Sequence, residues 1–188
     1  MTEQQKLKIS FLVNQRERLW IPVDLLLDDP KLFDQYHKEE EHWQAYQAGF
    51  QITVNGDLWN KTISLGNLES EMSWLTALAD ILRSDRWGTA SAQLQEELIL
   101  SLQRTQNLLT MEEKSQTNEI LCPSVCVDLE AFAAQFLPEA RKATEFVKLS
   151  NAWQSPQYLP GPFIADWESP LKVLEESFET FRNTKKGI

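Results

Sequence analysis

The sequence predicts an α+β fold in which an antiparallel sheet, built from hairpins, carries helices packed on one face. Two observations favour this class. Apolar residues first alternate with polar ones in paired short runs, as in hairpins, and later recur every three or four positions, as in helices. The order of these segments is not the strand–helix–strand alternation of a parallel sheet. We expect one domain over residues 1–150, with residues 151–188 forming an extended strap and a helix that pack on it.

Two hairpins are predicted in the first third of the chain. Alternating apolar residues fill residues 7–13 and 19–23 on either side of a polar break, which indicates a first hairpin. Pro22 lies in its second strand and cannot donate a ladder hydrogen bond, so this strand is expected at a sheet edge. Asn55-Gly56 follows a second alternating run and predicts a tight hairpin turn, because both turn residues need positive φ.

Three helices are predicted before the C-terminal segment. The first spans residues 30–48, with an acidic cap and Pro30 at its start and Gly49 at its end. The second follows Asn67 and continues to about residue 82 with an apolar stripe. The third begins at a capping aspartate, residue 128, and continues to about residue 147. Pro138 lies inside it and is expected to kink it or divide it in two.

The chain between the last two helices is predicted to return to strands. Residues 98–102 and 108–112 alternate around a turn, and residues 120–127 form another strand, bent by Pro123. The polar segment 113–118 is expected to be a loop.

A proline-rich strap is predicted after residue 150. Half of the eight prolines lie in residues 151–170, interleaved with aromatic residues, so an extended conformation is expected there. The aromatic side chains either pack on the domain core or bind another protein, and both alternatives remain open. A short helix is expected over residues 171–182.

Charge separates the possible classes of partner. The 28 acidic and 18 basic side chains give a formal net charge of −10. A field of this sign repels nucleic acids and anionic membranes, so neither is expected as a partner, whereas a basic protein is compatible with it. The start of the chain is polar and no apolar run approaches the length of a membrane span, which predicts a cytoplasmic protein.

The two cysteines are predicted to be buried free thiols. In a regular strand Cys122 and Cys126 would share a face about 13 Å apart, too far for a disulfide. With no further cysteine they form neither a zinc site nor a redox motif.

No catalytic or nucleotide-binding motif occurs in the sequence, and no cofactor is expected. If residues 30–48 are helical, Asp34, His37 and Glu41 share one face and offer two carboxylates and an imidazole. An enzyme or metal site there is one hypothesis, and a solvated helix face with an Asp34–Lys38 pair is the alternative.

Acidic residues beside aromatic ones are the candidate contacts for a basic partner, with tryptophan as an interface anchor. The alternative for the acidic residues is a solvated surface. The candidates are Glu39, Glu40, Glu41, Trp43, Glu112, Glu113, Trp153 and Trp167.

Residues 50–149 contain FQITVNGDLW, LESEMSWLTALADIL, LILSLQRTQNLLTMEE and VCVDLEAFAAQFLPEARKATEFV. In this order they resemble small acidic α+β immunity-type proteins of bacterial toxin–antitoxin and contact-inhibition systems. The resemblance implies a bacterial protein that binds the active surface of a toxin. It leaves the first hairpin and the strap unaccounted for, and it assigns no functional residue.

Three functions are therefore considered. The first is a non-enzymatic protein that binds and neutralises a basic partner, as an immunity protein does. The second is a structural or accessory subunit of a larger assembly, in which the strap is an interface. The third is an enzyme of unrecognised type that uses Asp34, His37 and Glu41.

Overall fold

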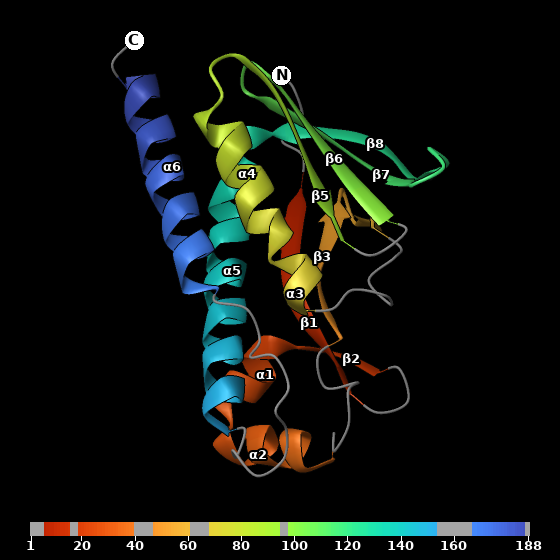
Figure 1. Ribbon diagram of the computed structural model, residues 1–188, viewed down its shortest axis with the longest axis vertical. Helices are drawn as coiled ribbons and strands as arrows, with labels where there is room; N and C mark the ends of the chain where they lie inside the picture. Colours follow the sequence, from red (N-terminus) through yellow and green to blue (C-terminus); the bar gives the residue numbers. More distant parts are fainter. Residues whose placement is uncertain are drawn as a thin grey trace.

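The computed structural model describes residues 6–15, 19–39, 47–60, 68–94, 98–153 and 167–186. The strands are β1 (Leu7–Gln15), β2 (Leu19–Pro22), β3 (Ala48–Val54), β4 (Asp57–Leu58), β5 (Trp87–Gln93), β6 (Leu98–Thr105), β7 (Leu108–Ser115) and β8 (Ile120–Asp128). The helices are α1 (Val23–Asp28), α2 (Pro30–Glu39), α3 (Leu68–Glu71), α4 (Ser73–Arg83), α5 (Leu129–Trp153) and α6 (Glu168–Lys186). The predicted α+β class is confirmed (Figure 1).

The strands form two antiparallel sheets, ordered β2-β1-β3-β4 and β5-β6-β7-β8. Both predicted hairpins are confirmed in the first sheet, and β2 with its Pro22 lies at the edge, as expected. Asn55 and Gly56 have φ values of 55° and 94°, the positive pair that a tight hairpin turn requires. The two sheets are joined where the Trp59 indole N–H donates to the Pro123 carbonyl at 2.8 Å.

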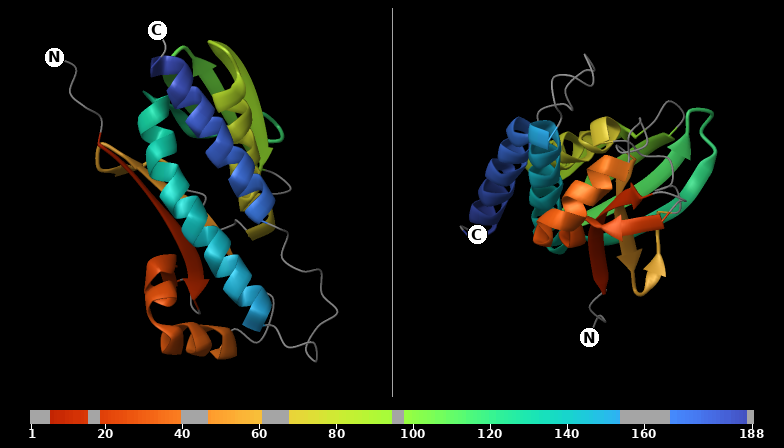
Figure 2. Two further views of the ribbon diagram at one scale, coloured as in Figure 1. Left: turned by 90° about the vertical axis from the view of Figure 1, so that its left-hand side faces the viewer. Right: turned by 90° about the horizontal axis from the view of Figure 1, so that it is seen from below.

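Three long helices stack in two layers against the sheets. Helix α5 packs on β1, and α4 packs on β5 and β6. Helix α6 lies outside them, against both α4 and α5, as Figure 2 shows from below. The apolar stripes predicted for α4 and α5 point inward, because side chains three and four residues apart share one helix face.

Aromatic rings dominate the centre of the core. Phe50 of β3 lies 4.9 Å from Phe11 of β1 and 4.4 Å from Phe136 of α5, between ring centroids. Trp74 of α4 lies 5.8 Å from Phe136. Rings at these distances and tilts stabilise the core beyond the apolar area that they bury.

The helix predicted over residues 30–48 is wrong at its end. Ala48 and Gly49 belong to β3, opposite Val13 and Leu12 of β1. Gly49 is therefore a strand residue and not a helix terminator, because pairing with β1 outweighs its local preference. Val23, predicted to end a strand, is instead the first residue of α1. Pro22 occupies the N-cap position of this helix, with a φ of −60° and no side-chain capping hydrogen bond.

The polar segment predicted as a loop at residues 113–118 is also wrong in its first part, because β7 continues to Ser115. Glu113 pairs with Leu100 and Cys122 across the sheet and points into the core. A glutamate at an inward strand position hides the period-two pattern on which the strand prediction depends.

Helix α5 is not divided at Pro138. A proline in a helix removes one hydrogen bond to the carbonyl four residues earlier, here that of Ala134. Ala134 and Pro138 both lie on the exposed side of α5, where water can reach this carbonyl. The opposite side is held by buried residues such as Phe132 and Phe136. The predicted cap is present, since the Ala131 N–H donates to Asp128 at 2.8 Å.

The predicted strap is shorter than expected at both ends. Helix α5 extends to Trp153, and α6 already begins at Glu168. Pro170 lies in the first turn of α6, where its missing N–H leaves no helical hydrogen bond unmade. Residues 154–166 lie outside the described residues.

Bulges in β8 reverse the faces of its residues. The register with β7 shifts between Met111 and Glu113 and again before Lys114. An extra residue at a bulge turns the following side chains to the opposite face. Cys122 is consequently buried and Cys126 exposed, both as free thiols. The prediction that both thiols are buried is wrong for Cys126.

Candidate functional site

Part of the predicted partner site lies outside the described residues. Glu39 is the last residue of α2, but its side chain is not described, and Glu40, Glu41 and Trp43 lie outside the described residues. The same holds for the Trp153 side chain. In the alternative enzyme hypothesis, Asp34 is exposed on α2, whereas the His37 side chain and Glu41 are again not described. Both hypotheses remain predictions for these residues.

Glu113 cannot contact a partner in this structure. It is 1% exposed, and its carboxylate accepts a hydrogen bond from the Cys122 thiol at 3.0 Å. Glu112, its neighbour in sequence, points to the opposite side of β7, as alternate strand residues do. There it pairs with Lys114 and accepts a hydrogen bond from the Ser124 hydroxyl at 2.7 Å. Of the predicted pair, only Glu112 can reach a partner.

Trp167 is also buried, at 1% exposure, just before α6 begins. Its ring centroid lies 5.9 Å from Phe11 and 6.5 Å from Phe50. In this structure Trp167 is therefore not exposed to a partner, and it packs on the core, which is one of the two alternatives left open for the aromatic residues of the strap. Its apolar ring anchors the start of α6 on the protein's own core.

The surface that the structure does offer is one side of the β5–β8 sheet. Alternation and register place one set of side chains on the helices and the other set on the opposite side, which we call the outer face. Every residue of the outer face is exposed or half-buried. They are Trp87, Thr89, Ser91, Gln93, Ile99, Ser101, Gln103, Thr105, Leu108, Thr110, Glu112, Lys114, Ile120, Ser124, Cys126 and Asp128.

The outer face has a polar centre and apolar ends. A shallow hollow of about 380 Å³ occupies the centre, lined mainly by serine, threonine and glutamine. At one end Trp87 is 66% exposed and Leu108 46% exposed, with only Thr105 between them in the strand register. At the other end Ile120 is 58% exposed. Large exposed apolar residues next to polar ones, with an aromatic side chain among them, are typical of surfaces that bind proteins.

Sequence reasoning missed this surface. On β5 the outward residues are Trp87 and three polar residues, and the inward ones are glycine and alanine. The period-two alternation is present but weak, because glycine and alanine carry little hydrophobic signal. Trp87 is the one strong hydrophobic residue among the outward positions of this strand, and tryptophan is enriched at interfaces.

A buried pair of carboxyl groups lies between the sheets. Glu71 ends α3 and is 5% exposed, and its carboxyl group accepts a hydrogen bond from the Phe50 N–H at 3.2 Å. Burial raises the pKa of Glu71 to about 8, against the lowering effect of this hydrogen bond, and the charge of Glu113 raises it further. Glu71 is therefore largely protonated at neutral pH and contributes to the core as a neutral group.

Within the described ranges, no group of three or more His, Cys, Asp and Glu side chains is arranged to hold a metal ion. None of the helices in the same ranges is both long and apolar enough to cross a membrane. The chain matches no family model, no curated protein and no solved structure. The geometry of the outer face is therefore the basis for the function proposed below.

Proposed function

We propose that this protein is a non-enzymatic binding protein that holds, and thereby neutralises, a basic partner protein. The outer face of the β5–β8 sheet is the proposed contact surface. The observation that carries the proposal is the exposed pair of Trp87 and Leu108 at one end of this face. Tryptophan is among the residues that contribute most to interface affinity when a partner covers it.

Charge supports a basic partner. The formal net charge of −10 attracts cationic proteins at long range and repels anionic ones. On the outer face itself, Glu112 and Asp128 are the carboxylates and Lys114 is the one cation, and Glu112 is already paired with it. The proposed interface therefore has an apolar anchor for affinity and a weakly acidic surface for orientation. The sequence resembles immunity-type proteins, and neutralising a toxin in the way such proteins do is one form that this binding could take.

The experiment is a capture with the tagged full-length chain from its native cell, followed by a titration with the purified partner. We expect one stoichiometric partner that is richer in Lys and Arg than in Asp and Glu. Its affinity should fall as salt rises, because counterions screen the attraction. An acidic partner, or an affinity that does not depend on salt, would contradict the proposal. Several partners that resist salt would instead favour a subunit of a larger assembly.

A further inference from the structure

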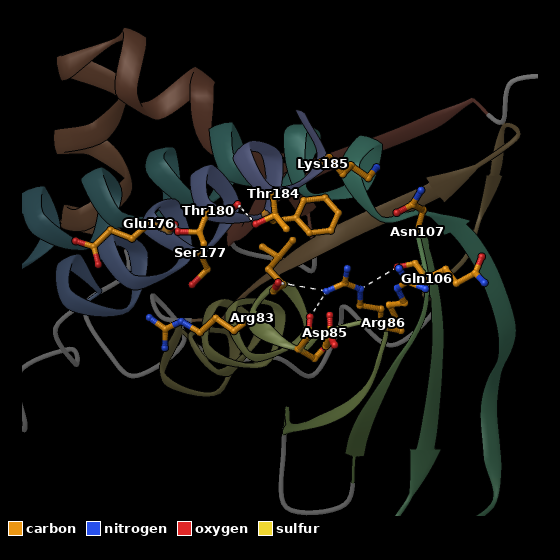
Figure 3. Close-up of a pocket in the computed structure, with 14 residues that line it drawn as sticks. Arg83, Asp85, Arg86, Gln106, Asn107, Glu176, Ser177, Thr180, Thr184 and Lys185 are labelled. Atoms are coloured by element: carbon orange, nitrogen blue, oxygen red, sulfur yellow. Dashed lines mark hydrogen bonds between the residues drawn. The ribbon is translucent and has the colours of Figure 1, made fainter. Parts of the chain in front are cut away.

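A second, larger cavity lies between α6 and the end of α4. It has a volume of about 810 Å³, within the range of small-molecule pockets. The C-terminal half of α6, the segment from Leu82 to Arg86 and the β6–β7 turn line it (Figure 3). We call it the cationic pocket, because Arg83, Arg86, Arg104 and Lys185 outnumber its two carboxylates, Asp85 and Glu176.

Arg104 of β6 is held rigidly in this pocket. It is 8% exposed, and its Nε donates to the Gln106 carbonyl at 2.8 Å. Its Nη1 donates to the last carbonyls of α4, those of Ile81 and Leu82 at 3.3 Å and that of Ser84. The guanidinium also lies over the Phe181 ring of α6, 4.9 Å from its centroid. These contacts fix the position of the charge before any ligand arrives.

The remaining nitrogen of this guanidinium, Nη2, forms no hydrogen bond within the described part of the chain. Its N–H groups are therefore available to an acceptor in the pocket. A guanidinium keeps its charge at neutral pH even when burial lowers its pKa, as it does for Arg104. A rigid arginine with free N–H groups is well suited to bind a phosphate or carboxylate.

The other cationic side chains of the pocket differ in whether a carboxylate already pairs with them. Lys185 donates to Glu130 at 3.1 Å, so part of its charge is already neutralised. Arg83 and Arg86 form no ion pair with any described residue. Asp85 is close enough to Arg104 to favour its charged form, and it therefore competes with an incoming anion. In Figure 3, Arg86, Asn107 and Lys185 lie toward one end of the pocket and Arg83 and Glu176 toward the other.

Apart from Lys185, the α6 wall of the pocket offers acceptors and not donors. The hydroxyl groups of Ser177, Thr180 and Thr184 each donate to the carbonyl four residues earlier, at 2.6, 2.8 and 2.9 Å. Their oxygen lone pairs remain available to a ligand that carries its own donors, as does the carboxylate of Glu176. The pocket thus combines arginine donors with a wall that accepts hydrogen bonds.

We propose that the cationic pocket binds a small phosphate ester that also carries hydroxyl or amino groups. The phosphate lies against Nη2 of Arg104 and the side chain of Arg86, and the hydroxyl or amino groups donate to the α6 wall. The volume admits a molecule larger than phosphate alone. None of the residues that line this pocket belongs to the outer face. The proposal of a phosphate-ester site therefore does not depend on the proposed partner binding.

The test is calorimetric titration of the full chain with glycerol phosphate and adenosine monophosphate, with inorganic phosphate, glycerol and adenosine as comparisons. Arg104 is unsuitable for the primary substitution, because it also holds α4 in place. Arg86→Ala removes an exposed side chain and should weaken binding of the phosphate ester about 10- to 100-fold. Asp85→Asn removes the competing carboxylate and should strengthen it.

Lys172→Ala is the matched control, since Lys172 is an exposed cation of α6 that does not line the pocket. It should leave the affinity unchanged. Equal affinities for the esters and for inorganic phosphate would overturn the assignment of the α6 wall. No binding of any of the phosphates, or equal losses in Arg86→Ala and Lys172→Ala, would overturn the site itself.

Discussion

The Phe50 N–H donates to the buried carboxyl group of Glu71 at 3.2 Å, on the edge of β3 that faces away from β1. Phe11, paired with Phe50 in the sheet, makes a similar contact on its other side, where its N–H donates to Glu139 at 2.8 Å. Two carboxyl groups thus satisfy backbone donors that strand pairing leaves unbonded. Burial raises the pKa of the Glu71 carboxyl group to about 8.

The raised pKa of Glu71 predicts that stability falls as pH rises. Its pKa increases from 4.5 to about 8 on folding, so the folded state holds the proton more tightly than the unfolded state. The stabilisation is complete below about pH 4.5 and is lost as pH rises toward 8. Within this window the group's contribution falls by roughly 1 kcal/mol for each pH unit.

Glu71→Gln tests this prediction, because the amide oxygen can still accept from Phe50 and carries no charge. Urea denaturation across the window should show a flatter pH dependence than the parent chain, and greater stability above pH 8. Glu119→Gln, at an exposed position before β8, is the control and should preserve the parent slope. Parallel slopes for the parent and Glu71→Gln would contradict the assignment.

Arg104 is predicted to be the main link between β6, α4 and α6. Arg104→Ala removes the donors to the α4 carbonyls and the contact with Phe181, and should lower the free energy of unfolding by about 2–4 kcal/mol. Arg182→Ala is the matched control. Arg182 also lies over a ring of α6, 5.7 Å from the Phe178 centroid, but it is exposed. Its loss should cost less than about 1 kcal/mol, and similar losses for both variants would count against the special role of Arg104.

Asn60 is predicted to protect the open edge of β3. Its side chain accepts from the Ile52 N–H at 2.8 Å and donates to the Phe50 carbonyl, and thus replaces a neighbouring strand. Asn60→Ala leaves both buried groups unbonded and should cost about 2–4 kcal/mol in chemical denaturation. Gln103→Ala, an exposed amide on β6, should change stability by less than about 0.5 kcal/mol. A free energy of unfolding that hardly changes in Asn60→Ala would show that water replaces the hydrogen bonds to the Ile52 N–H and the Phe50 carbonyl.

A substitution at Gly56 measures the energetic cost of positive φ for a non-glycine residue, without steric contacts. Its φ is 94°, and a Cβ atom added there meets nothing within 4 Å. Gly56→Ala should therefore destabilise the protein through backbone strain alone, by about 1 kcal/mol. Thermal and urea unfolding measure it. An unchanged stability would mean that the turn relaxes into another type.

How much of this structure the sequence predicts depends on where each signal originates. The Asn55-Gly56 turn and the α5 stripe follow from local chemistry, and both were predicted correctly. Gly49 was assigned to the wrong element because its conformation depends on pairing with β1, far away in sequence. In β8, bulges turn some side chains to the opposite face of the sheet, and no local sequence pattern predicts these bulges.

The candidate site was less predictable than the fold. Glu113 and Trp167 were expected at a surface because of their residue types, but burial places both in the core. Glutamate is seldom buried, so only the three-dimensional structure reveals that Cys122 and Glu71 surround it. The outer face could not be derived either, since which side of a sheet remains uncovered depends on how the helices pack.

The affinity of the purified partner for Trp87→Ala, compared with the parent chain, tests the proposed function most directly. Leu25→Ala is the control, because Leu25 is a similarly exposed apolar residue, 53% exposed, on α1 and away from the outer face. We expect Trp87→Ala to weaken binding by at least about 2 kcal/mol, roughly 30-fold, with unchanged stability, and Leu25→Ala to bind as the parent does. Full affinity in Trp87→Ala would show that the partner binds elsewhere and contradict the central claim.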